Sequence, residues 1–199
     1  MTAFDDATLS FYAKEAPLYS ASGTGGISRH LEGFLAQLKP GAEVLELGCG
    51  GGLDAAFMIA RGFVVYPTDG TPEIAAKASE RLQRPVRVMR FDELNEVERY
   101  DAVYASASLL HVPLAALSGI LAATHRALRP AGKHFASYKA GGVAGRDRFG
   151  RYFKYLSPDQ AERLYRAAAP WADVRIEETM GGGYDGVQGP WLKVTAAKC

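Results

Sequence analysis

Hydrophobic and polar positions alternate between two patterns from residue 27 to the C-terminus. Short apolar runs, typical of buried strands, are followed by segments whose apolar residues recur every three or four positions, as in amphipathic helices. This alternation predicts an α/β fold with a doubly wound parallel sheet. The predicted strands span residues 42–47, 63–68, 85–90, 100–105, 133–138, 171–179 and 191–197.

Local signals place helices between these strands. Thr71 and Pro72 are typical of the N-cap and the first position of a helix. Ser157 and Gln160 predict a capping box at the start of another helix. The remaining periodic segments predict helices at 27–38, 53–60 and 113–128.

The stretch between the first strand and its helix carries the strongest chemical signal. Glu46 is followed at alternate positions by Gly48, Gly50 and Gly52. Glycines let a ligand lie against the backbone, and free N–H groups at a helix start favour polar or anionic ligand groups. An ordinary tight turn is the alternative. The dinucleotide-binding fingerprint needs glycine where this chain has Leu53, which argues against NAD.

A second acidic residue, Asp69, lies at the end of the second predicted strand, 17 residues after Gly52. A carboxylate at this position of a nucleotide-binding sheet accepts hydrogen bonds from ribose hydroxyls. A solvated aspartate in a turn is the alternative. Since ligands bind at the carboxyl ends of parallel strands, Glu46 and Asp69 are predicted to belong to one site.

Composition narrows the class of protein. The chain has 199 residues, 48% of them hydrophobic and 23% charged, and its net charge is +1. These ordinary globular values fit one domain over residues 1–199 and give no basic footprint for nucleic acid. No apolar run approaches the ~20 residues of a membrane span, and the N-terminus lacks a signal-peptide pattern. We therefore expect a soluble, cytoplasmic protein without nucleic-acid or membrane partners.

Cysteine usage argues against two further classes. Cys49 lies inside the glycine-rich stretch and Cys199 is the last residue. Two such cysteines predict neither a disulfide framework nor a cysteine-built zinc site, and no metal is expected. The oligomeric state is left open between a monomer and a weak dimer.

The glycine-rich stretch and Asp69 resemble the corresponding motifs of class I S-adenosylmethionine (SAM) dependent methyltransferases, and the resemblance covers nearly the whole chain. It implies a Rossmann-like, seven-stranded, mostly parallel sheet with helices on both faces and an antiparallel last strand inserted between its neighbours. It also implies SAM as the cofactor. The cofactor-binding residues that it implies are Tyr12, Tyr19, Glu46, Gly48, Cys49, Gly50, Asp69, Gly70, Asp92, Glu93, Ala105 and Ser106.

The resemblance gives these residues roles along the cofactor. Residues 48–52 would pack against its methionine part, and Asp69 with Gly70 would bind the ribose. Asp92 would contact the adenine amino group, although a cap on the following short helix is the alternative. The backbone near Ala105 and Ser106 would face the sulfonium.

The N-terminal segment, residues 1–26, is expected to close over the cofactor as a lid that excludes water. Tyr12 and Tyr19 are its aromatic candidates, with ordinary packing as the alternative, and residues 23–26 are rich in glycine. Arg29 is a candidate partner of the cofactor carboxylate, with a solvated helix face as the alternative.

The chain shows no obvious catalytic triad, and methyl transfer needs none, because the sulfonium already activates the methyl group and positioning supplies most of the acceleration. His111 is the candidate general base or acceptor-orienting group, since imidazole titrates near neutral pH. A histidine satisfied inside its loop is the alternative.

The loop at 139–156 follows the fifth predicted strand, so it belongs at the same sheet edge as the cofactor. Its cations, interleaved with aromatic residues and glycines, suit an anionic acceptor, with a flexible basic surface loop as the alternative. Together with residues 68–72 and 108–112, this loop resembles the tellurite-resistance branch of small methyltransferases. The resemblance implies a tellurite- or selenite-type oxyanion, a thiol or a carboxylate as acceptor. The predicted substrate-binding residues are His111, Lys139, Arg146, Arg148 and Tyr152.

Other functions are weighed against this one. Amino-methylating nucleic-acid enzymes carry an Asn/Asp-Pro-Pro-Tyr/Phe motif after the fourth strand, where this chain has residues 105–108 in the order Ala-Ser-Ala-Ser. A small-molecule acceptor is therefore expected. A SAM-binding sensor without turnover is the alternative, and a nucleotide-dependent oxidoreductase is disfavoured by Leu53.

Overall fold

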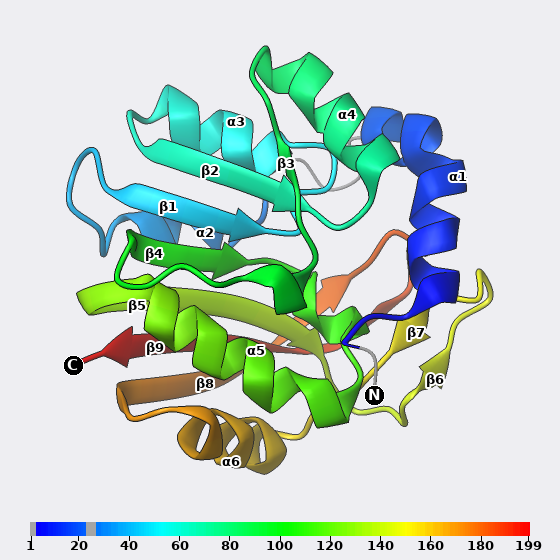
Figure 1. Ribbon diagram of the computed structural model, residues 1–199. Helices are drawn as coiled ribbons and strands as arrows, with labels where there is room; N and C mark the ends of the chain where they lie inside the picture. Colours follow the sequence, from blue (N-terminus) through cyan, green and yellow to red (C-terminus); the bar gives the residue numbers. More distant parts are fainter. Residues whose placement is uncertain (1–2, 23–26) are drawn as a thin grey trace.

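The computed structural model describes residues 3–22 and 27–199. Its main element is a seven-stranded sheet with the strand order β3-β2-β1-β4-β5-β9-β8 (Figure 1). All pairings from β3 to β5 are parallel, whereas β9 runs antiparallel to both of its neighbours, β5 and β8. This order confirms the predicted fold, including the inserted antiparallel last strand.

The strands lie near the predicted ranges, with the largest differences at β3 and β5, while β8 ends three residues later and β9 begins three residues earlier than predicted. β3 has two residues where six were predicted, because it lies at the sheet edge, pairs only with β2 and leaves both residues exposed. β5 begins five residues early, because Leu128 pairs with Tyr100 ahead of an irregularity in the register. The bounds are β1 (Glu43–Leu47), β2 (Val64–Asp69), β3 (Arg87–Val88), β4 (Tyr100–Ala105), β5 (Leu128–Lys139), β8 (Trp171–Gly182) and β9 (Gln188–Lys198).

Six α-helices accompany the sheet in the described part of the chain: α1 (Asp6–Ser22), α2 (Leu31–Leu35), α3 (Leu53–Ala60), α4 (Pro72–Leu82), α5 (Leu114–Ala127) and α6 (Pro158–Ala168). The capping box at α6 is confirmed, with Gln160 N donating to Ser157 Oγ at 3.2 Å and Ser157 N to Gln160 Oε1 at 3.0 Å. α2 is shorter than the predicted 27–38, because tighter turns follow it before Pro40.

Helices cover both faces of the sheet, with α5 and α6 in front and α2 and α3 behind in the view of Figure 1. Alternate residues of β4 belong to the two cores that result. Val103 packs with α5 and α6, whereas Ala102 and Tyr104 pack with α2 and α3. Because β4 is buried on both faces, packing holds it in place within the sheet. The loop that follows β4 therefore starts from a well-defined position at the carboxyl edge of the sheet.

The N-terminal segment forms α1, which crosses the carboxyl ends of the strands from α4 to the short hairpin of β6 (Gly145–Arg146) and β7 (Tyr152–Phe153) (Figure 1). A covering segment was predicted here, but not a helix. Its buried residues are Thr8, Ala16 and Ser20, so no apolar stripe marks it in the sequence. The glycine-rich part of the predicted lid, 23–26, lies outside the described residues. Within the described ranges no helix is long and apolar enough to cross a membrane.

Candidate active site

The glycine loop, residues 48–52, connects β1 to α3 and is tied to β2. The backbone N–H groups of Gly48 and Cys49 both donate to the carbonyl of Thr68, at 3.0 and 2.8 Å. Gly48 has a φ of 73°, and a Cβ there would lie 2.6 Å from Cβ of Ser108. Only glycine fits this position, so the local sequence fixes how closely β1 and the loop after β4 approach.

Two cavities open beside this loop. The larger has a volume of about 590 Å³ and extends from the glycine loop to the β8–β9 hairpin. The smaller has a volume of about 90 Å³ and lies between α1, Asp69 and the segment after β3. Both are lined by Tyr19, Gly48, Gly50 and Ala107, so the cavities adjoin along the loop.

Glu46 lies in the wall of the larger cavity with an unsatisfied carboxylate. It is only 3% exposed, and its Oε2 has no hydrogen-bond partner among the described residues. Burial, together with the nearby carboxyls of Asp54 and Asp69, raises its pKa well above the ordinary range. Asp54 lines the same cavity and accepts a hydrogen bond from Ser28 N at 2.7 Å. A cation in this cavity would satisfy both groups.

Asp69 ends β2 in the wall of the smaller cavity, next to Gly70. Its carboxylate accepts hydrogen bonds from Gly50 N at 3.1 Å and Thr71 N at 2.9 Å. Burial raises its pKa to about 6, against the effect of these hydrogen bonds. The carboxylate therefore joins the glycine loop to the start of α4 and is ionised at neutral pH.

The two acids expected beside adenine both contact Arg90. They belong to η1 (Phe91–Glu93), where Arg90 lies 3.5 Å from Asp92 Oδ1 and 2.9 Å from Glu93 Oε1. Arg90 N also donates to Glu93 Oε2 at 2.7 Å, which makes Glu93 the capping residue of this turn. Phe91 and Arg90 line the smaller cavity, whereas the two carboxylates do not. Glu93 thus makes the capping contact that was the alternative for Asp92, and the adenine contact of both residues stays a prediction.

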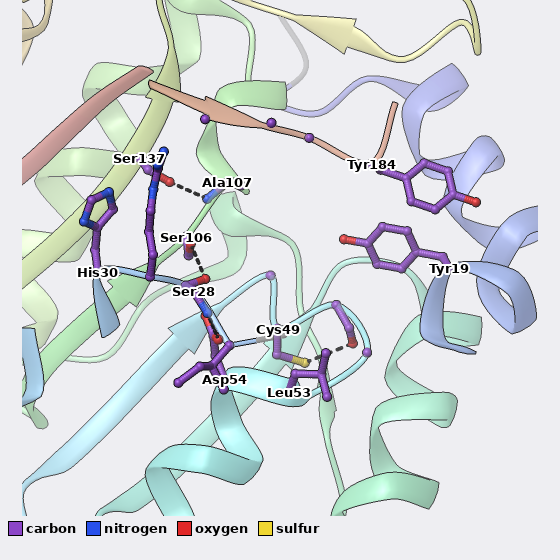
Figure 2. A pocket seen from close by; sticks show the side chains of 18 of the residues that line it. Tyr19, Ser28, His30, Cys49, Leu53, Asp54, Ser106, Ala107, Ser137 and Tyr184 are labelled. Atoms are coloured by element: carbon purple, nitrogen blue, oxygen red, sulfur yellow. Dashed lines mark hydrogen bonds between the residues drawn. The ribbon is translucent and has the colours of Figure 1, made fainter. Parts of the chain in front are cut away.

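The end of β4 contributes backbone rather than reactive side chains. Ala105 is fully buried, and Ser106 and Ala107 line the larger cavity. Ala107 has a φ of 50°, a strained value for a residue with a Cβ, and its N–H donates to Ser137 Oγ at 2.8 Å. Ser106 Oγ is 2.8 Å from Ser28 Oγ, and Figure 2 shows these groups and Asp54 joined by hydrogen bonds in the cavity wall.

His111 lies in η2 (Leu109–His111) with both ring nitrogens engaged. Its Nδ1 is 2.6 Å from the carbonyl of Tyr152, which only accepts, so Nδ1 carries the proton. Its Nε2 therefore accepts from the Tyr12 hydroxyl at 3.1 Å. Burial lowers the pKa of His111 to about 4, and the ring is neutral. These contacts agree with the alternative of a satisfied histidine.

The two lid tyrosines both reach the site from α1. Tyr19 lies against the glycine loop, where a Cβ on Gly50 would be 3.2 Å from its ring, and its own ring faces Tyr184 across the cavity mouth (Figure 2). Tyr12 stacks edge-to-face on Tyr19 and lines the smaller cavity. Burial raises the pKa of each phenol, so both hydroxyls are protonated.

The cations of the 139–156 loop are already paired. Lys139 lies 3.1 Å from Asp185, Arg146 makes a double contact with Asp5 of α1 at 2.7 and 2.9 Å, and Arg148 donates to the carbonyl of Asp185. Tyr152 donates its N–H to Thr8 Oγ1, also in α1. None of these four residues lines either cavity. The loop thus contacts the N-terminal segment through Arg146 and Tyr152 and the β8–β9 turn through Lys139 and Arg148, and its role in binding an acceptor stays a prediction.

The sequence analysis missed several residues of the larger cavity. Asp54 follows the glycine loop in the first turn of α3, and an acid in that turn, facing the loop, is a signal that sequence alone offers. Ser28 and Ser137 carry no such signal, because their partners, Ser106 and Ala107, are distant in the sequence.

Comparisons with known proteins agree with this geometry. Residues 44–132 match a family model described as a methyltransferase domain. This methyltransferase match includes the glycine loop, Asp69 and the end of β4. Over 98 residues the chain is 31% identical to an uncharacterized methyltransferase of Synechocystis, covering 48% of this chain and 46% of the relative. Over 115 residues it is 36% identical to a ubiquinone biosynthesis O-methyltransferase of Xanthomonas axonopodis, covering 54% and 47%. The chain thus spans about half the length of the curated relatives it matches.

Several solved structures are similar in fold to nearly the whole chain. The 1,6-didemethyltoxoflavin-N1-methyltransferase of Burkholderia thailandensis, solved with S-adenosylhomocysteine, superposes with a TM-score of 0.74 at 24% identity over 96% of this chain and 87% of its own. TehB of Haemophilus influenzae gives 0.72 at 16% identity over 94% and 67%. The [4+2]-cyclase SpnF gives 0.74 at 17% identity over 100% and 97%. At these identities the structures confirm the fold, whereas the methyltransferase description comes from the sequence match over residues 44–132.

Proposed function

We propose that this chain is a SAM-dependent methyltransferase that acts on a small-molecule acceptor. The observation that carries the proposal is the pair of carboxylates on either side of the glycine loop. Glu46 is buried and unsatisfied in the larger cavity, and Asp69 lines the smaller one. The cavities adjoin at Gly48 and Gly50, so an elongated ligand with an amine at one end and a ribose at the other matches both.

The residues present fit this cofactor. Glu46 and Asp54 would hold its ammonium group, and Asp69 would accept from the ribose hydroxyls. When bound, SAM supplies a methyl group activated by a positive sulfonium. The chain then has to orient the acceptor at the end of β4, near Ser106 and Ala107, and exclude water with α1. Such positioning is worth roughly 7–11 kcal/mol, so methyl transfer does not depend on His111 as a general base.

The acceptor within this proposal is small and anionic: a tellurite- or selenite-type oxyanion, a thiol or a carboxylate. Its support is the sequence resemblance to the tellurite-resistance branch, to which the TehB structure adds similarity of fold. A cytoplasmic location, a single domain over residues 1–199 and the absence of nucleic-acid partners belong to the same proposal.

Calorimetry with S-adenosylhomocysteine, SAM and NAD tests the cofactor. We expect micromolar-range binding of the first two and none of NAD. Incubation with methyl-labelled SAM and a panel of selenite, tellurite, thiols and carboxylates then tests turnover. Affinity for NAD without affinity for either sulfur compound would refute the proposal.

A SAM-binding sensor without turnover is the second candidate. It is favoured by the engagement of both nitrogens of His111, which leaves this imidazole without a free nitrogen to act as a base. The cyclase among the structural neighbours is a reminder that this fold serves more than one reaction. A sensor would bind S-adenosylhomocysteine and leave every acceptor of the panel unlabelled.

A further inference from the structure

The carboxylates in the walls of the larger cavity all lie at one of its two ends. Glu46 and Asp54 lie at the glycine-loop end, where the cofactor amine is proposed to bind. The opposite end is built by β5, β8, β9 and the turn between the last two. The described residues that line this end include no carboxylate; they are Ser137, Thr179, Gly181, Gly182, Gly183, Tyr184, Gln188 and Trp191.

Arg29 is exposed and reaches this second end, next to a residue whose position is fixed by hydrogen bonds. Its neighbour Ser28 is held by Asp54 through its N–H, at 2.7 Å, and by Ser106 through its hydroxyl, at 2.8 Å. The Arg29 guanidinium lies against β8, where a Cβ on Gly181 would collide with it. Glycine at position 181 therefore makes room for this cation in the cavity wall.

The guanidinium of Arg29 is available for a ligand. It makes no hydrogen bond or ion pair with any residue in the described ranges 3–22 and 27–199. Arg81, the other arginine of the cavity wall, donates instead to the carbonyls of Gly51 and Ser20. On β8, Glu177 is paired with Lys193 at 2.7 Å.

We propose that Arg29 binds the negative charge of the methyl acceptor, a carboxylate or a small oxyanion. The proposal rests on the proposed function and deepens it by naming the anion-binding residue. A guanidinium binds such groups with two parallel hydrogen bonds, which fixes their orientation as well as their position. Gln188 lines the same end of the cavity and offers an amide as a second donor. The anion site thus lies on β8 and β9 rather than on the 139–156 loop.

The test uses the full chain saturated with S-adenosylhomocysteine and follows the Nε–H resonances of its arginines by nuclear magnetic resonance. The probes are benzoate and sulfate, with chloride at equal ionic strength as the control for screening. We expect both probes, but not chloride, to shift the Arg29 signal saturably. Arg29→Gln should weaken benzoate binding roughly tenfold, as expected for loss of a charge-assisted pair, and Arg29→Lys should restore part of it.

Two further variants separate position from charge. Gly181→Ala keeps the cation but displaces it, so it should also weaken benzoate binding. Arg175→Gln removes an exposed arginine of the same strand, paired with Asp173, and should leave binding unchanged. A shift of the Arg29 signal by S-adenosylhomocysteine alone, with no response to either anion, would assign Arg29 to the cofactor carboxylate and overturn the inference. Failure of S-adenosylhomocysteine to bind at all would instead refute the proposed function.

Discussion

Two glutamates three residues apart on β1 have opposite environments. Glu43, at the amino end of the strand, accepts from Arg99 at 2.7 Å and from the Tyr66 hydroxyl at 2.7 Å, and it pairs with Arg129. Hydrogen bonds from Arg99, Tyr66 and Arg129 lower its pKa to about 2. Glu46, at the carboxyl end, has an unpartnered oxygen and a raised pKa. The same side chain is satisfied at one edge of the sheet and left unsatisfied at the other.

The difference separates stability from binding. Polar groups at the amino edge satisfy one another's hydrogen bonds, and Asp101 extends this network through an ion pair with Arg129 at 3.0 Å. At the carboxyl edge Glu46 remains unsatisfied and Ala107 holds a strained backbone. Buried polar groups without partners destabilise a fold, so their presence at a cavity is expected where a ligand supplies the partner.

The largest effect is expected from Asp69→Ala. Loss of two charge-assisted hydrogen bonds to the ribose should raise the Kd of S-adenosylhomocysteine about 100-fold. Isothermal calorimetry measures this change. Because Asp69 also holds Gly50 N and Thr71 N, a thermal melt must confirm that the variant is folded. A folded variant with unchanged affinity would place the ribose elsewhere.

Glu46→Gln is expected to weaken S-adenosylhomocysteine about tenfold, since it removes the charge opposite the ammonium while keeping the shape. The melting temperature should not fall, because glutamine relieves the burial of a carboxylate. Reduced stability with unchanged affinity would assign Glu46 to the same structural class as Glu43.

Local sequence predicts most of this architecture because its determinants are local. Apolar runs predicted β1, β2 and β4, Ser157 and Gln160 predicted the start of α6, and the glycines predicted the loop after β1. The errors concern partners that are distant in the chain. Arg146 was predicted to bind an acceptor, and its pairing with Asp5 was not foreseen, because Asp5 lies 141 positions away and no pattern near either residue indicates the pair. α1 was missed as a helix because it buries small and polar residues rather than an apolar stripe.

Glu43→Gln is the counterpart of Glu46→Gln at the amino edge. It should lower the free energy of unfolding by about 1 kcal/mol, because Arg99 and Arg129 lose a shared and partly exposed partner. Urea denaturation measures this loss. The Kd of S-adenosylhomocysteine should stay unchanged, and any weakening comparable to that of Glu46→Gln would show that the two edges are not independent.

The smallest effect is expected from pH, and its sign differs between the edges. The pKa of Asp69 is raised to about 6, so acidification protonates the group that accepts from the ribose. Between about pH 7.5 and about pH 5.5 its ionised fraction falls about fourfold, and the affinity for S-adenosylhomocysteine should fall with it. Calorimetry across this range measures the slope, which should persist in Glu46→Gln and disappear in Asp69→Asn.

The stability of the ligand-free protein should change in the opposite direction to the affinity over part of this pH range. Because folding raises the pKa of Asp69, its contribution to stability is complete below its unfolded value of 3.8 and is lost as the pH rises through about 6. Folding lowers the pKa of Glu43 from 4.5 to about 2, so its contribution is present above 4.5 and is lost as the pH falls through about 2. As the pH rises from about 4.5 to 6, Asp69 ionises and the ligand-free protein should therefore become less stable. Its affinity for S-adenosylhomocysteine should increase over the same interval. Urea titrations of the wild type and Asp69→Asn over this interval test the link: equal slopes for both proteins would contradict it, because only the wild type retains the carboxyl group.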